Sequence, residues 1–111
     1  MIKWPELSSF NKLDKNMQNM CATLERALDI DVVCTSGFRT KEHNDLVGGV
    51  SNSSHLTGQA IDLTCFDSKM RFKIVFSALV SGFKRIGIGR NHIHLDIDNT
   101  KPQNIIFFDN M

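Results

Sequence analysis

Apolar side chains recur every three or four residues along positions 9–28, a spacing that places them on one face of a helix. The members of this stripe are Phe10, Leu13, Met17, Met20, Leu24 and Leu28. Ser8 and Ser9 precede the stripe and offer hydroxyl groups for an N-cap, and residues 29–31, which include two aspartates, follow it. The pattern predicts an amphipathic helix over residues 9–28.

Two shorter elements are predicted next. A β-branched valine pair favours a strand over about residues 31–36. Thr40 can cap a short helix over residues 41–47, and the glycine pair Gly48-Gly49 can adopt the left-handed conformation that ends a helix. A polar turn over residues 51–54 follows.

Residues 59–65 alternate in polarity, which predicts a strand with Asp62 on the side opposite its apolar side chains. Asp67 or Ser68 can then cap a helix that Gly82 ends. This helix carries the apolar residues Phe72, Val75, Phe76, Leu79 and Val80.

The remaining elements form a meander. Strands are predicted over residues 85–88 and 92–97, with a hairpin turn at residues 89–91, and an edge strand over residues 105–108. The predicted order is helix, strand, helix, strand, helix and then a meander of strands, which indicates an α+β fold in which helices pack on a small antiparallel sheet. No repeat or linker divides the chain, so residues 1–111 are predicted to form a single domain.

The composition excludes several classes of protein. With 41% apolar and 23% charged residues in 111, the chain resembles an average globular domain. The net charge is only +1 and the basic residues are scattered, so no nucleic-acid partner is expected. No stretch approaches the roughly 20 apolar residues that span a bilayer, so membrane insertion is not expected either. Nothing requires more than a monomer.

The cysteines and the N-terminus bear on the compartment. Cys21, Cys34 and Cys65 are odd in number and form no close pair, so we expect them to be reduced and mostly buried. The first residues include charges at positions 3 and 6 and no apolar run, so no secretory signal is recognised. Synthesis in the cytoplasm is expected.

The segment from Ser53 to Asp62 contains the first candidate for chemistry. His55 lies in the polar turn, and Asp62 lies early in the following strand. Gly58 between them lets the backbone bend, so that the carboxylate can come back towards the imidazole. Taken alone, this spacing also fits a histidine in a turn and an aspartate that caps a helix or forms an ion pair.

A second candidate follows near the C-terminus. Residues 92–98 alternate without a break, which places His92, His94, Asp96 and Asp98 on one face of a strand. A solvated sheet face would also explain this pattern. The two segments together favour a metal site, because a catalytic zinc ion takes three nitrogen or oxygen ligands and keeps one position open. His55, Asp62 and one of His92 or His94 would complete such a set.

Three separated motifs resemble the zinc D-Ala-D-Ala carboxypeptidase family. They are Ser36-Gly37-Phe38-Arg39-Thr40 followed by Gly48-Gly49, then Ser53-x-His55-x-x-Gly58-x-Ala60-x-Asp62, and last His94. The resemblance runs in order from about Val33 to Asp96. That family shares its fold with the hedgehog signalling domain, hydrolyses amide bonds of peptidoglycan stem peptides and includes phage endolysins. The resemblance therefore implies a zinc metallopeptidase with peptidoglycan as its partner.

The resemblance assigns roles residue by residue. His55, Asp62 and His94 match the three zinc ligands. Arg39 matches an arginine that contacts oxygen atoms of the substrate, a task for which a planar guanidinium is suited. Ser53 matches a serine whose hydroxyl group hydrogen-bonds substrate. The fourth histidine, His43, is expected on the surface of its short helix, outside the site.

One position departs from the family pattern. Better-known members have Glu or Asp three residues before the last ligand as general base, and this chain has Asn91 there. An amide cannot accept the proton of an attacking water molecule. His92 is the expected substitute, because it shares a strand face with His94 and an imidazole titrates near neutral pH. Asp96 and Asp98 are further candidates.

Three functions are consistent with these observations. The first is a peptidoglycan peptidase, either a D-Ala-D-Ala carboxypeptidase or an endolysin-type endopeptidase. The second is a zinc-binding domain without catalysis that binds the wall or belongs to a virion, and the third is an enzyme of this fold that cleaves another amide or ester. A wall substrate together with cytoplasmic synthesis suggests a phage-encoded protein that acts at the cell wall.

Overall fold

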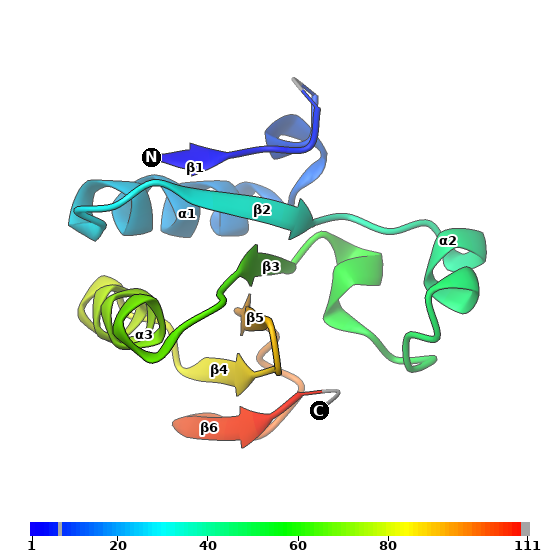
Figure 1. Ribbon diagram of the computed structural model, residues 1–111. Helices are drawn as coiled ribbons and strands as arrows, with labels where there is room; N and C mark the ends of the chain where they lie inside the picture. Colours follow the sequence, from blue (N-terminus) through cyan, green and yellow to red (C-terminus); the bar gives the residue numbers. More distant parts are fainter. Residues whose placement is uncertain (7, 110–111) are drawn as a thin grey trace.

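The computed structural model describes residues 1–6 and 8–109. Six strands form one sheet in the order β1-β2-β3-β5-β4-β6. In chain order the elements are β1 (Ile2–Lys3), the 3-10 helix η1 (Phe10–Lys12), α1 (Lys15–Ala27), β2 (Val32–Ser36), α2 (Lys41–Leu46), the 3-10 helix η2 (Ser54–Thr57), β3 (Ala60–Thr64), α3 (Ser68–Ser81), β4 (Arg85–Ile88), β5 (His92–Asp96) and β6 (Ile105–Phe108). Figure 1 shows their arrangement.

The sheet is antiparallel at its centre and parallel at its two ends. β2, β3, β5 and β4 pair antiparallel, as the sequence predicts. The outer strands β1 and β6 pair parallel with β2 and β4, which the sequence pattern did not predict. The predicted α+β class, with helices packed on a small sheet, is confirmed.

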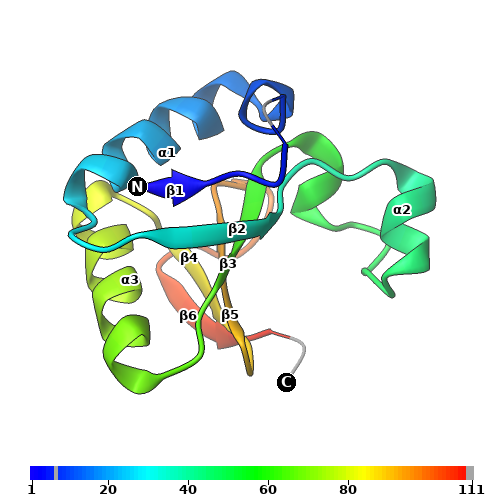
Figure 2. The same cartoon turned by 45° about the horizontal axis from the view of Figure 1, so that its top comes forward.

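The hydrophobic core lies between the sheet and the two long helices. α1 and α3 lie side by side on the same face of the sheet (Figure 2). Met17 and Leu24 of α1 and Ile74 of α3 are fully buried against the strand residues that point to this face. Those strand residues include Ile61, Leu63, Ile93 and Leu95. All three cysteines are buried and free of disulfides, as expected.

The first helix begins later than predicted. Residues 10–12 form η1, and α1 begins only at Lys15, because the Asp14 side chain accepts hydrogen bonds from the backbone N–H groups of Asn16 and Met17. The predicted cap at Ser9 makes no side-chain capping bond. Asp and Ser are comparable N-caps, so the helix begins after the one whose side chain makes the capping bonds, Asp14.

α3 has the predicted limits, with Asp67 as its N-cap and Gly82 at a φ of 101° as its end. Most of the apolar side chains noted for this helix nevertheless lie in solvent. Phe72 is 70% exposed and Phe76 is 56% exposed, and their rings stack on each other. The face that packs on the sheet is built from smaller residues, Ile74, Ser77 and Ala78.

Alternation along β3 and β5 determines where the site lies. Ile61 and Leu95 point into the core, so their neighbours Asp62 and His94 point to the opposite face of the sheet. The segment that contains α2 and η2 borders this opposite face, at one end of the sheet (Figure 2). In the described part of the chain, no helix has the length and apolar character needed to cross a membrane.

Candidate metal centre and active site

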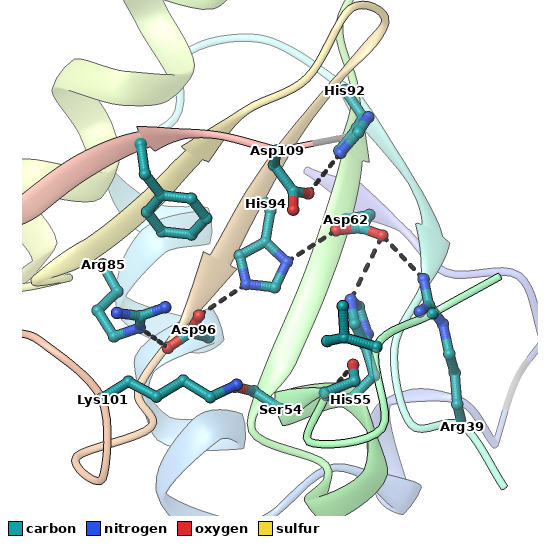
Figure 3. Close-up of a pocket in the computed structure, with 14 residues that line it drawn as sticks. Arg39, Ser54, His55, Asp62, Arg85, His92, His94, Asp96, Lys101 and Asp109 are labelled. Carbon is teal, nitrogen blue, oxygen red and sulfur yellow. Dashed lines mark hydrogen bonds and ion pairs between the residues drawn. The ribbon is translucent and has the colours of Figure 1, made fainter. Parts of the chain in front are cut away.

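A cleft of about 330 Å³ lies on this face of the sheet. Its lining includes the predicted site residues, drawn in Figure 3: Arg39, Ser53, His55, Asp62, His92 and His94. Its volume falls at the small end of the range for ligand-binding pockets. The structure therefore brings together residues that are up to 55 positions apart in the sequence.

His55 is held at the cleft by the turn that the sequence predicts around Gly58. The Ser53 hydroxyl group accepts a hydrogen bond from the His55 backbone N–H and so caps η2. Gly58 ends η2 with a φ of 72°. A Cβ atom at this position would lie 2.8 Å from the backbone nitrogen of Asp14, so both the conformation and the close packing require glycine.

His55 and His94 converge on the carboxylate of Asp62. The distance from His55 Nε2 to Asp62 Oδ2 is 3.3 Å, and His94 Nδ1 lies 3.1 Å from Asp62 Oδ1. β3 and β5 pair Asp62 directly with His94, so the sheet itself fixes this half of the cluster. All three side chains are buried or nearly so, with exposed fractions of 3% for His55, 13% for Asp62 and 11% for His94.

The nitrogen atom of each imidazole that points away from Asp62 also has a hydrogen-bond partner. His55 Nδ1 lies 2.7 Å from the Gly37 carbonyl oxygen, and His94 Nε2 lies 2.7 Å from Asp96 Oδ2. A carbonyl and a carboxylate can only accept hydrogen bonds, so both of these nitrogens carry protons. Asp96 is itself 1% exposed and accepts a hydrogen bond from Arg85 Nε. Such partners orient metal-binding histidines and fix their tautomers.

The same contacts shift the pKa values in the cluster. Burial lowers the pKa of His94, but hydrogen bonds to Asp62 and Asp96 outweigh this effect and raise its pKa to about 9. Burial raises the pKa of Asp62, but hydrogen bonds from the two histidines outweigh it, and the pKa falls below its usual range. The cluster therefore holds an anionic carboxylate between the inward nitrogen atoms of two imidazoles.

The donor chemistry of this cluster fits a metal ion. His55 Nε2, a carboxylate oxygen of Asp62 and His94 Nδ1 all lie within 4.8 Å of one another. Since the outward nitrogens keep their protons, loss of the protons on the inward nitrogens leaves two lone pairs beside a carboxylate. Two nitrogen atoms and one oxygen atom form the donor set of a catalytic zinc site.

Arg39 borders the cluster on the side of α2. Its Nη2 lies 3.2 Å from Asp62 Oδ2, its Nε donates to the Ser36 hydroxyl group, and its Nη1 donates to Asn44 Oδ1. Asn44 is 1% exposed and was not singled out in the sequence. Gly49 makes room for it, because a Cβ atom at that position would collide with the Asn44 side chain.

Comparison with known proteins agrees with the motifs. Residues 6–96 match the family model described as Peptidase M15. The chain belongs to this family. The resemblance to zinc D-Ala-D-Ala carboxypeptidases is thereby confirmed at the level of the family, and the α+β architecture agrees with it. A search of curated proteins found no match.

The M15 match leaves the last strand uncovered, and this strand brings in a residue that the sequence pattern missed. Asp109 follows β6 and lies beyond the matched residues 6–96. Its Oδ2 lies 2.8 Å from His92 Nε2, and both residues line the cleft. Only the pairing of β6 with β4 brings Asp109 to the site, so no local signal could identify it.

The remaining residues considered in the sequence, His43, Asp96 and Asp98, lie outside the three-residue cluster. His43 is exposed in α2 and does not line the cleft. Asp98 is buried, and accepts hydrogen bonds from the Ser54 and Thr100 hydroxyl groups. These bonds and the nearby ammonium group of Lys101 outweigh burial and lower the pKa of Asp98 to about 2. Asp96 and Asp98 are thus occupied by structural partners.

Proposed function

We propose that the protein is a zinc metallopeptidase that hydrolyses amide bonds in peptidoglycan stem peptides, as a D-Ala-D-Ala carboxypeptidase or an endolysin-type endopeptidase. The observation that carries this proposal is the convergence of His55 Nε2, His94 Nδ1 and the Asp62 carboxylate at the bottom of a cleft. Membership of the peptidase M15 family supports hydrolysis of a peptide bond as the reaction. The protein is proposed to act as a monomer.

Arg39 and Ser53 line the same cleft as the three proposed ligands and are the groups that can bind substrate. Bound zinc supplies a Lewis acid that polarises a carbonyl group and lowers the pKa of a water molecule. Arg39 has five N–H groups, of which three are engaged by Ser36, Asn44 and Asp62. The others are available to the oxygen atoms of a substrate. Ser53 lines the same cleft, where its hydroxyl group can donate to substrate while it accepts from the His55 backbone.

Proton transfer is assigned to the pair formed by His92 and Asp109. His92 shares its strand face with His94, and the hydrogen bond that His92 donates to Asp109 raises the pKa of His92 more than burial lowers it. The pair lies at the edge of the cleft and includes the carboxylate that position 91 lacks. It therefore combines an acid with a base where family members have a single acidic residue.

The test combines metal analysis with product analysis. Protein purified without an affinity tag is expected to contain one zinc ion per chain by elemental analysis, and to release shorter muropeptides from whole peptidoglycan by chromatography. The products identify the bond, and so distinguish the carboxypeptidase from the endopeptidase. His55→Ala and Asp62→Ala should lose both zinc and activity, whereas His43→Ala should keep both. A wild-type protein without zinc would contradict the proposal.

One observation favours a second candidate function. The side chain at position 91 is an amide, which cannot act as a base, and this fits a zinc-binding domain that binds the wall or belongs to a virion without catalysis. One zinc ion per chain without any muropeptide product would support that function. A phage-encoded enzyme, made in the cytoplasm and acting at the wall, is proposed as the biological setting of the peptidase.

A further inference from the structure

Asn91 lies in the turn between β4 and β5, outside the cleft. Asn91 is exposed, and its backbone carbonyl oxygen accepts a hydrogen bond from the Cys65 N–H. It does not line the cleft, whereas Asp109 does. A peptidase on this scaffold therefore needs an acidic group from another element.

His92 is poorly placed to take the proton itself. Its Nε2 is engaged by Asp109 Oδ2 at 2.8 Å. Its ring lies against the backbone of Gly89, where a Cβ atom would come within 2.2 Å of Nδ1. Nε2 is therefore engaged by Asp109 and has no free lone pair for a proton from the cleft, as Figure 3 illustrates. A carboxylate that accepts a hydrogen bond from His92 keeps the imidazole proton on Nε2.

Asp109 is fixed close to the cluster. Its backbone N–H donates to the Ile88 carbonyl oxygen at 2.9 Å, which extends the pairing of β6 with β4. Gly87 makes room for it, since a Cβ atom there would lie 2.9 Å from Asp109 Cβ and 3.1 Å from His94 Cβ. A carboxylate oxygen of Asp109 lies within 4.8 Å of one of Asp62.

The carboxylate of Asp109 has acceptor capacity to spare. His92 engages Oδ2, and among the described residues no hydrogen bond to Oδ1 is formed. The hydrogen bond from His92 outweighs burial and lowers the pKa of Asp109, so the group is ionised at neutral pH. It is 24% exposed, so water can reach it from the cleft. An ionised, accessible carboxylate beside the cluster can accept a proton from a water molecule in the cleft.

We propose that Asp109 is the catalytic base of the peptidase and that His92 is its positioning residue, which reverses the role expected for His92 from the sequence. The inference rests on the proposed function. The water oxygen forms a bond to the substrate carbonyl carbon while one of its protons passes to the Asp109 carboxylate. The carbon–nitrogen bond then breaks, and the amine nitrogen leaves with that proton, so Asp109 returns to its ionised form.

The experiment compares Asp109→Asn with His92→Gln on the muropeptide that the wild-type protein cleaves. Asp109→Asn should lower kcat by about 10²–10⁴-fold, the usual effect of a general base, with KM and zinc content unchanged. His92→Gln keeps an N–H donor for Asp109, so kcat should fall by roughly tenfold or less. Asp109→Glu should recover part of the lost rate. Asp29→Asn, an exposed aspartate paired with Lys73, is the matched control and should be unaffected.

A second readout does not depend on turnover. In metal-free protein, nitrogen NMR should show the proton of His92 on Nε2, and Asp109→Asn should change that resonance while the His55 resonances stay in place. Circular dichroism verifies the fold of each variant, and Asp109→Ser replaces Asp109→Asn if the latter fails to fold.

The outcomes separate the inference from the proposed function. A larger loss of kcat in His92→Gln than in Asp109→Asn would overturn the inference alone, as would loss of zinc from Asp109→Asn, which would make Asp109 a ligand. A zinc-loaded wild-type protein that cleaves no muropeptide would overturn the inference together with the proposed function.

Discussion

At the scale of single residues, His94 links proton binding to stability. Its pKa of about 9 lies above its value of about 6.5 in an unfolded chain, so the charged form stabilises the metal-free fold. This stabilisation is complete below pH 6.5 and is lost as the pH rises towards 9. Between pH 6.5 and 8, the free energy of unfolding of metal-free protein should fall by about 1–2 kcal/mol, measured by urea denaturation.

The metal-loaded protein should behave differently over the same range. A metal ligand has already lost its proton, so the stabilisation by protonated His94 is absent from the start. Removal of the metal with a chelator should therefore introduce the decline, and His94→Asn should reduce it. The measurement stops at pH 8 so that ionisation of the thiols does not contribute to the change in stability. Burial raises the pKa values of Cys21 and Cys34 to about 12, and their unfolded forms ionise near pH 9. A metal-free protein of constant stability would refute the ion pair.

At the scale of elements, Gly58 allows η2 to end in the conformation that places His55 in the cleft. Gly58→Ala should destabilise the protein by at least about 2 kcal/mol, because the left-handed conformation costs a residue with a Cβ atom roughly 1 kcal/mol and the new atom meets the Asp14 backbone. Gly48→Ala is the matched control: it has the same φ, within 1°, and nothing within 4 Å, so only the first cost applies. Equal losses in urea denaturation would show that packing at Gly58 is unimportant.

α3 provides a second prediction at this scale. Ile74 is fully buried, so Ile74→Ala should cost about 2–5 kcal/mol of stability. Phe72→Ala removes a larger side chain but should cost less than about 1 kcal/mol, because 70% of Phe72 is in solvent and its main partner is the stacked ring of Phe76. Thermal and urea denaturation of both variants test this order. The reverse order would mean that the exposed rings are covered in solution.

Sequence patterns predicted most elements because local rules govern them. Thr40 begins α2 and Gly82 ends α3, as expected. The alternation of polar and apolar residues correctly placed Asp62 and His94 on the sheet face opposite the core. The errors arose where tertiary packing decides. The first helix is capped by Asp14 and not by a serine, because residues 10–12 form η1 before α1 begins. The second error concerns α3, which has more apolar residues than one helix face can bury.

At the scale of the whole molecule, the site depends on pairings between distant strands. Asp62 and His94 meet because β3 pairs with β5, and Asp109 reaches His92 because β6 pairs with β4 in parallel. The motifs identified the first group because they hold its members in a recognisable order. Asp109 has no such motif, since its proximity to His92 follows only from the strand order.

The positions of the three proposed ligands also predict how metal should change global stability. His55 comes from η2, which lies beside the sheet, whereas Asp62 and His94 come from its centre. A metal ion would therefore tie the segment of residues 37–58 to the core. Zinc at 100 times its Kd should raise the free energy of unfolding by about 2.7 kcal/mol and Tm by roughly 10 °C.

Calorimetry and hydrogen exchange test this expectation together. Exchange should slow in residues 41–57 on addition of zinc, while the protected core of α1 and β3 changes less, because those elements are already held by the hydrophobic core. Asp62→Ala should show neither effect, and His43→Ala should show both. If zinc raised Tm without protecting residues 41–57, the ion would have to bind within the sheet alone, and His55 would not be a ligand.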